Sequence, residues 1–445
     1  MKIPYIINKN TVVVYTPSKN SLQLVGENIR KLVAENFEWD KDHCPSLKEY
    51  CVNAIGKNFE NKPILDELPC SDRVHLLDIL PIKLPLELMI PLIDDEYYWK
   101  RRYHETYGLI KRHLPENWTY KSVYIERHVQ QLIEEAQPQY NDEETFDEIL
   151  DLCSPYVTCL YIEQMQAWKP PLTMEKEDIP EEYPIDHINF WPILRRLPEV
   201  EEFHLIYGMN KVGEDFSWRM FKVSVSDCQK LGKALLELKN LKIVRIHRSS
   251  LEFKHCQALM QGLIKHKFIE ELDLSNCDVG DAGALCIAQY LMDGCSLKTL
   301  ILANNQIGQI GSEGLGFAIL NDNCDTLYDL NLRMNPLGTP GAMGIMRALV
   351  RCSKIRNLSF ASCIFDEDTP LKVCQMLKLN ASLKVLDISS NWFGESGGRE
   401  LLDALTINMT VESLDLRETD ITPEQLEKIT EYLDRNKNIE DDGKV

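Results

Sequence analysis

Residues 269–277 read Ile-Glu-Glu-Leu-Asp-Leu-Ser-Asn-Cys, and residues 297–305 read Leu-Lys-Thr-Leu-Ile-Leu-Ala-Asn-Asn. Both stretches fit the pattern Leu-x-x-Leu-x-Leu-x-x-Asn/Cys, in which x is any residue and Ile can replace the first Leu. Related stretches begin at Leu327, Ile355, Leu383 and Val411, and the central leucine advances in steps of 28 residues with one step of 30. Such regular spacing predicts a repeat array.

Each repeat predicts one strand and one helix. In Leu272-x-Leu274 the alternation turns the leucines inward and the residues beside them outward. The Asn or Cys that ends the strand can hydrogen-bond to backbone groups of the neighbouring turn. A glycine often follows, as in Val279-Gly280, and then an amphipathic helix such as Asp281–Leu291. Stacked repeats predict an α/β solenoid with parallel strands on its concave face and helices outside.

The array extends upstream of these six repeats. Leu241 begins a further repeat at the regular spacing, whereas Val200 and Val157 begin strand signatures at irregular spacings. We therefore expect degenerate repeats with insertions over residues 151–240 and a regular solenoid over residues 241–436.

Two segments of this part differ from the repeats. Thr422-Pro423-Glu424 has the signature of a helix start and predicts a capping helix over Gln425–Asn436, followed by an acidic tail over residues 437–445. Residues 175–182 combine prolines with acids and predict an exposed loop.

Residues 1–150 have no repeat and predict a mainly α-helical module. Ser21–Glu38 and Val123–Ala136 place apolar residues three and four apart, as amphipathic helices do. Between them, Leu84-Pro85-Leu86 followed by Tyr98-Trp99-Lys100 resembles an F-box, which would recruit a ubiquitin-ligase core. The alternative is a plain helical packing unit with Trp99 and Tyr98 buried.

The composition indicates which classes of partner the chain binds and in which cellular compartment it resides. The chain has 445 residues and a net charge of −20, which argues against nucleic acid and against broad contact with an acidic filament. The clusters Lys100-Arg101-Arg102 and Lys111-Arg112-His113 either dock on an acidic patch or form solvated helix faces. No apolar run reaches the length of a membrane span, and the N-terminus lacks a secretory signal, so we expect a cytoplasmic protein with reduced cysteines and no membrane contact.

We expect that the chain is not an enzyme and that it has no cofactor and no metal site. Gly308, Gly311, Gly314 and Gly316 crowd like a phosphate loop but lack its Gly-Lys-Ser/Thr, and equivalent glycines recur in other repeats. His255-Cys256 and the cysteines at 277, 286 and 295 lack paired ligand spacing and predict structural thiols. The acids Asp273, Asp387 and Asp415 occupy equivalent repeat positions, which indicates a solvated row of side chains and not catalytic acids.

The outward positions of the strands are the candidate partner-binding site. They form two columns on the concave face, and the second column is mainly small, which permits close approach of an extended or helical partner. The first column is Arg245, Asp273, Ile301, Asn331, Ser359, Asp387 and Asp415, and the second is His247, Ser275, Ala303, Arg333, Ala361, Ser389 and Arg417. Arg333 and Arg417 could pair with acids of the partner. The alternative is that this face is merely solvated.

The repeats and their helices, such as Val279-Gly280-Asp281-Ala282-Gly283, resemble the ribonuclease-inhibitor class of leucine-rich repeats. Together with the segments from Leu80 to Leu88 and from Tyr97 to Tyr103, the chain is similar to the dynein regulatory complex subunit 5 family, also called the t-complex-associated testis-expressed family. The resemblance implies a scaffold in the nexin link between the doublet microtubules of motile cilia and flagella, which regulates dynein-driven sliding. It implies other subunits of that complex as partners, contact with the axonemal microtubules mostly through other proteins, and no catalytic residues.

Two other functions stay open. One is the ubiquitin-ligase substrate receptor already described. The other is a GTPase-activating protein, which is suggested only because one such family shares the repeat class.

Overall fold

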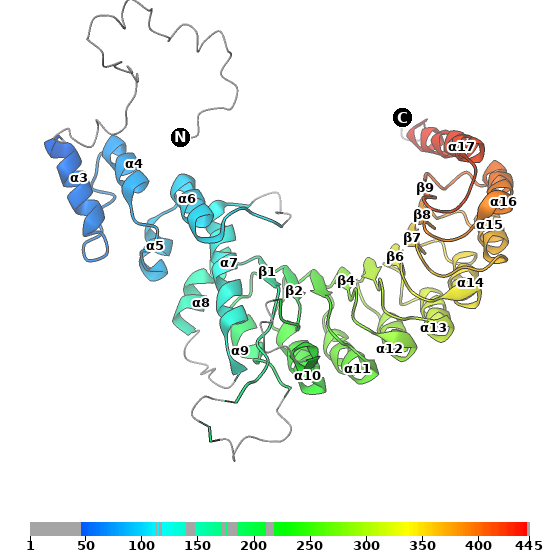
Figure 1. Cartoon of the computed structure of the whole chain (residues 1–445), viewed down its shortest axis with the longest axis horizontal. Helices are drawn as coiled ribbons and strands as arrows, with labels where there is room; N and C mark the ends of the chain where they lie inside the picture. Colours follow the sequence, from blue (N-terminus) through cyan, green and yellow to red (C-terminus); the bar gives the residue numbers. More distant parts are fainter. Residues whose placement is uncertain are drawn as a thin grey trace, which may run out of the picture. The chain divides into compact units, whose positions relative to one another are not determined.

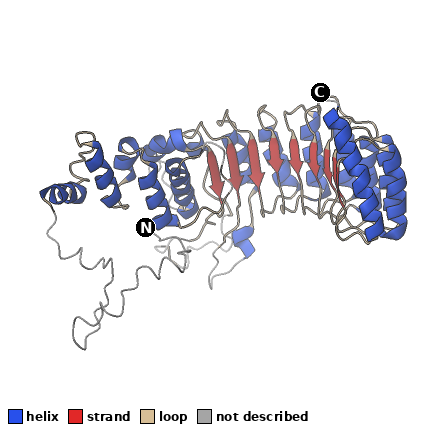
Figure 2. Cartoon of the chain, turned by 90° about the horizontal axis from the view of Figure 1, so that it is seen from above, coloured by secondary structure: helices blue, strands red, loops and turns tan. Residues whose placement is uncertain are grey.

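The predicted repeats each supply one strand to a single parallel sheet in the computed structural model (Figure 2). Within the part of the chain that the structure describes, the sheet has nine strands in chain order, so each strand pairs with the strands of the preceding and following repeats. The strands are β1 (Cys159–Ile162), β2 (Glu202–Leu205), β3 (Ile243–Ile246), β4 (Glu271–Asp273), β5 (Thr299–Ile301), β6 (Asp329–Asn331), β7 (Asn357–Ser359), β8 (Val385–Asp387) and β9 (Ser413–Asp415). The regular repeats and the two degenerate ones are therefore confirmed as strand-forming units.

The structure describes residues 46–112, 114, 118–138, 147–170, 174–175, 185–210 and 218–442. The chain divides into two units, residues 1–83 and residues 84–445. The boundary expected near residue 150 does not coincide with this division, because helices before that residue pack on the first strand. The helix predicted over Ser21–Glu38 and most of the loop predicted over residues 175–182 lie outside the described residues.

In the first unit, helix α3 (Leu47–Lys57) packs against α4 (Cys70–Ile79). Ser46 caps α3, because its Oγ accepts a hydrogen bond from the backbone N–H of Glu49 at 3.2 Å and the Glu49 carboxylate accepts one from the Ser46 N–H at 2.7 Å. This reciprocal arrangement satisfies two donors that a helix start otherwise leaves free.

In the second unit, the strands lie on the inside of a curve and the repeat helices lie on the outside (Figure 1). The helices before the sheet are α5 (Leu86–Leu92), α6 (Glu96–Tyr107), α7 (Tyr120–Glu135) and α8 (Asp147–Cys153). Those of the array are α9 (Trp191–Leu194), α10 (Val225–Leu235), α11 (Phe253–Leu263), α12 (Gly280–Met292), α13 (Gln309–Ile319), α14 (Gly338–Leu349), α15 (Thr369–Leu379), α16 (Gly394–Ile407) and α17 (Pro423–Asp442), with short 3₁₀ turns at Ser154–Tyr156 and Trp218–Phe221. The helical N-terminal region and the solenoid class are thus confirmed.

The leucines of the repeats form the core of the array. Leu272, Leu300 and Leu386 are fully buried, and the register of the sheet aligns them in one row between the strands and the helices. A side chain of this size contributes about 2 kcal/mol when it is removed from water. The row explains why the spacing of these leucines is so strict.

Buried asparagines join successive repeats at the bend that follows each strand. The carboxamide oxygen of Asn335 accepts hydrogen bonds from the N–H groups of Asn305 (2.9 Å) and Ile307 (3.1 Å), and its nitrogen donates to the carbonyls of Leu302 and Leu332, both at 2.8 Å. Where cysteine replaces asparagine, the thiol of Cys277 donates to a carbonyl of the preceding repeat at 3.0 Å. The hydrogen-bonding role predicted for this position is confirmed.

The bend itself needs an unusual backbone. Residues on one or both sides of the Asn or Cys adopt positive φ, including Asn304 (53°), Gln306 (55°) and Ile364 (57°). This left-handed conformation is costly for residues other than glycine, and most costly for a β-branched residue. The hydrogen bonds of the buried asparagines hold the chain in it.

A helix covers each end of the array. At the first strand, Glu126 of α7 accepts hydrogen bonds from the N–H groups of Thr158 (3.1 Å) and Cys159 (2.8 Å), and Glu134 accepts one from the N–H of Glu163 (2.8 Å). Burial raises the pKa of Glu134. These carboxylates occupy donors of an edge strand that would otherwise invite further strand pairing.

At the last strand, α17 begins at the predicted cap, where Thr422 and Gln425 exchange hydrogen bonds between side chain and backbone. The helix runs to Asp442 and so includes most of the segment expected to be an acidic tail. Arg435 and Asn436 anchor this stretch, because both donate to the backbone carbonyl of Asn408, at 2.8 and 3.3 Å.

Candidate functional site

The outward side chains of the strands form continuous rows across the concave face. The register of the sheet connects the first predicted column from Arg245 to Asp415 without a break. It also continues that row in the other direction, to His204 of β2 and Tyr161 of β1. These two residues are not among the predicted positions, although they stand at the same offset from the inward residues of the degenerate repeats.

The fourteen predicted residues differ in exposure. Arg333 and Arg417 are exposed. Half-buried are Arg245, His247, Ile301, Asn331, Ser359, Asp387 and Asp415, whereas Asp273, Ser275, Ala303, Ala361 and Ser389 are buried. The two exposed arginines and the half-buried polar residues are therefore the polar groups of these two columns that solvent reaches.

Several first-column residues also stabilise the bend after their own strand. The carboxylates of Asp273, Asp387 and Asp415 and the amide oxygen of Asn331 each accept a hydrogen bond from the backbone N–H two residues later, at 2.9–3.1 Å. This is the geometry of an Asx turn. The row of acids expected to be solvated is thus partly structural, and Asp273 is buried.

Contacts within the chain already occupy part of the face. His247 Nε2 lies 2.9 Å from the carboxylate of Asp273, and Arg417 forms a pair with Asp415 at 2.5 Å. Burial alone would raise the pKa of Asp273, but hydrogen bonds from His247 and Ser275 outweigh it and leave the pKa below its ordinary value. Arg333, in contrast, has an exposed guanidinium with no ion pair to any residue that the structure describes.

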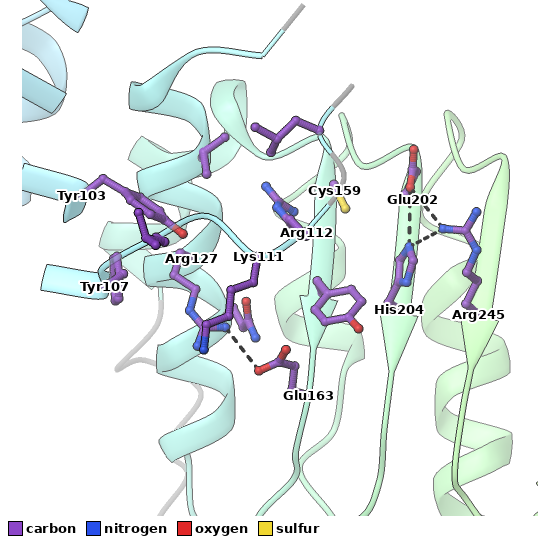
Figure 3. Close-up of a pocket in the computed structure, with 15 residues that line it drawn as sticks. Tyr103, Tyr107, Lys111, Arg112, Arg127, Cys159, Glu163, Glu202, His204 and Arg245 are labelled. Carbon is purple, nitrogen blue, oxygen red and sulfur yellow. Dashed lines mark hydrogen bonds and ion pairs between the residues drawn. The ribbon is translucent and has the colours of Figure 1, made fainter. Parts of the chain in front are cut away.

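A cavity of about 700 Å³ lies at the β1 end of this face (Figure 3). Its floor comes from strands β1 to β3, and its walls come from α6, α7 and the loop between them. The lining residues are Tyr103, Tyr107, Leu109, Lys111, Arg112, Leu114, Val123, Arg127, Gln130, Cys159, Tyr161, Glu163, Glu202, His204 and Arg245. Of the predicted site residues, only Arg245 belongs to this set, because the walls come from segments without a repeat.

A hydrogen-bonded cluster crosses the cavity floor. Arg245 Nη1 donates to His204 Nε2 at 2.8 Å and lies 3.5 Å from the carboxylate of Glu202, while its Nε donates to Glu271 at 2.6 Å. Burial lowers the pKa of His204, so its imidazole is neutral and can accept this hydrogen bond. Burial also raises the pKa of the neighbouring Cys159 thiol to about 12, which keeps it protonated.

The donor atoms of Cys159, Glu202 and His204 lie within 4.8 Å of one another, a set that could in principle hold a metal ion. The guanidinium of Arg245 already bonds to two of the three residues. An ion would have to displace it and would lie beside its positive charge. The donor set therefore fits the observed guanidinium better than a metal.

The glycine-rich stretch serves helix packing. Gly311, Gly314 and Gly316 lie in α13, where a β-carbon at any of them would approach atoms of a neighbouring helix within 2.4–2.8 Å. The N–H groups of Gly308 and Gly311 donate to the carboxylate of Asp281, at 2.7 and 2.9 Å. Since a carboxylate of the chain occupies these donors, the stretch is not arranged as a phosphate loop.

The F-box-like segment is part of the core of the second unit. Leu84, Leu86, Tyr98 and Trp99 are buried, and the indole N–H of Trp99 donates to the carbonyl of Ile93 at 2.8 Å. Arg102 is buried as well, with its guanidinium over the rings of Trp99 and Tyr124. The cluster Lys100-Arg101-Arg102 is therefore not a single solvated face. In the second basic cluster, Lys111 and Arg112 line the cavity and His113 lies outside the described residues.

Comparison with known proteins agrees with the repeat geometry. The family model described as Leucine Rich repeat matches residues 265–288 and 379–402, which contain β4 and β8. The chain is thus built of leucine-rich repeats. Over 294 residues it is 31% identical to Dynein regulatory complex subunit 5 of Mus musculus, a match that covers 62% of this chain and 57% of the mouse protein.

Relatives in other lineages extend this result. Dynein regulatory complex subunit 5 of Chlamydomonas reinhardtii is 28% identical over 46% of this leucine-rich-repeat protein and 48% of its own length. The Ribonuclease inhibitor of Sus scrofa is 28% identical over 55% of this chain and 52% of its own length. The chain is thus homologous to the dynein regulatory complex subunit 5 proteins and spans about half the length of the relatives that it matches. Within its described residues, no helix combines the length and apolar composition needed to cross a membrane.

Proposed function

We propose that the chain is a non-catalytic scaffold subunit of the nexin–dynein regulatory complex in motile cilia and flagella. It holds neighbouring subunits of the complex and helps to regulate dynein-driven sliding of the doublet microtubules. The observation that carries this proposal is the 31% identity to Dynein regulatory complex subunit 5 over 294 residues. The protein would then reside in the cytoskeleton of the axoneme.

The architecture supports a binding role without turnover. A sheet of nine parallel strands presents one continuous concave face, and repeat arrays commonly use such a face to bind other proteins. The net charge of −20 disfavours direct contact with an acidic microtubule surface, so other subunits would mediate most of that contact.

Tagged protein in ciliated cells tests the proposal. We expect it to remain with demembranated axonemes, to cross-link to other subunits of the regulatory complex, and to be required for a normal ciliary beat. A protein that is extracted completely with the detergent-soluble fraction and cross-links to none of these subunits would contradict the proposal. A substrate-receptor role in a ubiquitin ligase would instead require direct association with a ligase adaptor, although Leu84, Leu86 and Trp99 are occupied in the core.

A further inference from the structure

We propose that the cavity at the β1 end of the concave face binds an acidic segment of a partner protein. The carboxylates of this segment pair with cations at the cavity, and its apolar side chains contact the tyrosines that line it. The inference rests on the proposed function, in which the chain holds other proteins, and it specifies where one of them docks and with what chemistry.

Cations reach the cavity from separate parts of the fold. Lys111 and Arg112 come from the loop after α6, Arg127 comes from α7, and Arg245 comes from β3 (Figure 3). The acids among the lining residues are Glu163 and Glu202. Segments that lie apart in the sequence thus place basic groups around one cavity. This concentration of cations occurs in a chain whose net charge is −20.

These cations fall into two groups. Arg112 is paired with Glu126, and Arg245 is paired with Glu271 and Glu202, so both are held in place by acids of the chain. Lys111 is exposed and makes no hydrogen bond or ion pair with any described residue. Arg127 lies 3.7 Å from Glu163, with both side chains more than a third exposed, and its guanidinium also lies over the Tyr107 ring. Lys111 and Arg127 can therefore turn to a new carboxylate without leaving a buried acid unpaired.

Aromatic and apolar side chains also line the cavity, and one of them lies beside a cation: the guanidinium of Arg127 is 5.9 Å from the centre of the Tyr107 ring. Tyr103 and Tyr107 from α6 and Tyr161 from β1 line the cavity, and Leu109 beside them is 75% exposed. A volume of about 700 Å³ lies within the range of pockets that enclose a ligand, so several side chains of a peptide fit. Carboxylates next to apolar side chains match this mixture of basic and aromatic lining residues, which is why we assign an acidic peptide segment and not a small inorganic anion.

The net charge of the protein makes the experiment selective, because most of its surface repels an acidic probe. The probe is a short fluorescent peptide of Glu, Leu and Ser, and its partner has Gln in place of every Glu. Fluorescence anisotropy measures the binding of both peptides to the full chain. We expect the Glu peptide to bind, with an affinity that falls as salt is added, and the Gln peptide to bind more weakly.

The double variant Lys111→Glu/Arg127→Glu should weaken binding of the Glu peptide on the order of tenfold or more, because two attractive contacts become repulsive. Lys254→Glu/Lys428→Glu is the matched control, since the two lysines are exposed on α11 and α17 and the paired substitution makes the same change in charge. The milder Lys111→Gln/Arg127→Gln variant, with folding checked by circular dichroism, guards against a loss caused by misfolding. Unchanged binding by both Lys111/Arg127 variants would overturn the inference, as would an equal loss in the Lys254→Glu/Lys428→Glu control.

The axoneme experiment separates this inference from the proposed function. Suppose that the wild-type chain remains with axonemes and that the Lys111/Arg127 variants bind the Glu peptide as tightly as the wild type. The cavity assignment is then wrong and the scaffold role stands. Suppose instead that the chain is extracted from the axoneme, and that the Lys111/Arg127 variants lose binding of the Glu peptide while the wild type and the control keep it. The scaffold role is then wrong and the cavity assignment stands.

Discussion

At the scale of single residues, each buried asparagine stabilises the fold through several hydrogen bonds to the backbone. Asn335 accepts from two N–H groups and donates to carbonyls on both sides of the bend, and it is fully buried. Replacing it with alanine leaves those groups unpaired in the interior. We expect Asn335→Ala to lower the free energy of unfolding by about 3 kcal/mol, measured by urea denaturation.

Cysteine supplies the control for this position, because the chain itself uses it at Cys277 and Cys363. A thiol donates to a carbonyl but accepts only weakly. The Asn335→Cys variant should therefore lie between the wild type and Asn335→Ala. Equal losses for cysteine and alanine would mean that shape and not hydrogen bonding decides the residue at this bend.

The positive-φ residues next to the asparagines lead to a stabilising substitution. Ile364 has a φ of 57°, although it is β-branched and 70% exposed, and the other repeats with positive φ at this position hold Asp278, Gln306 and Asp420. Asparagine tolerates this backbone conformation better. We expect Ile364→Asn to raise the free energy of unfolding by about 1 kcal/mol in the same assay. Ile364→Val keeps the branch and should bring no such gain.

At the scale of elements, the capping of α10 links one insertion to the array. The carboxylate of Asp227 accepts hydrogen bonds from the His187 N–H and ring Nδ1, both at 2.9 Å, and from the N–H of Ser224 at 3.2 Å. Burial by itself would raise the pKa of Asp227, but the hydrogen bonds from His187 and Ser224 outweigh it and hold the pKa below its ordinary value of 3.8. The ionised form is therefore favoured in the folded protein.

This pKa fixes the sign of a pH effect. The contribution of Asp227 to stability is complete above its unfolded-state pKa and is lost as the pH falls through the lower folded-state value. We expect Asp227→Asn to cost about 3 kcal/mol at pH 7, since it removes one partner of a buried pair, and to cost less in strong acid. Urea denaturation of both proteins between neutral and acidic pH measures this, and a loss that stays constant over the whole range would refute the assignment.

At the scale of the whole molecule, the repeat spacing predicted the sheet because every strand buries apolar side chains at the same positions of its repeat. The sequence signatures that begin at Val157, Val200 and Leu241 predicted β1 to β3, even where insertions interrupt the regular spacing. The cavity was not predictable in this way. Its walls come from α6, α7 and the loop between them, which have no repeat, and packing of the chain, not periodicity, places Lys111 and Arg127 against strands that follow much later.

The contacts of the array also predict how it unfolds. Strands pair only with the strands of adjacent repeats, and the helices of the array likewise contact their immediate neighbours. Stability in such an array is the sum of local terms, so damage stays near its origin. Leu386→Ala, which removes a fully buried side chain of β8, should cost about 3 kcal/mol and speed amide hydrogen exchange mainly in β7 to β9.

Val244→Ala in β3 is the matched variant at the other end, because Val244 is equally buried and lies in the same row of the core. It should speed exchange in β2 to β4 and leave β8 and β9 unchanged. Mass spectrometry of exchanged peptides resolves the two patterns. If either substitution accelerated exchange uniformly from β1 to β9, the array would unfold as one cooperative unit, and the cavity at the first strands would depend on packing at the far end.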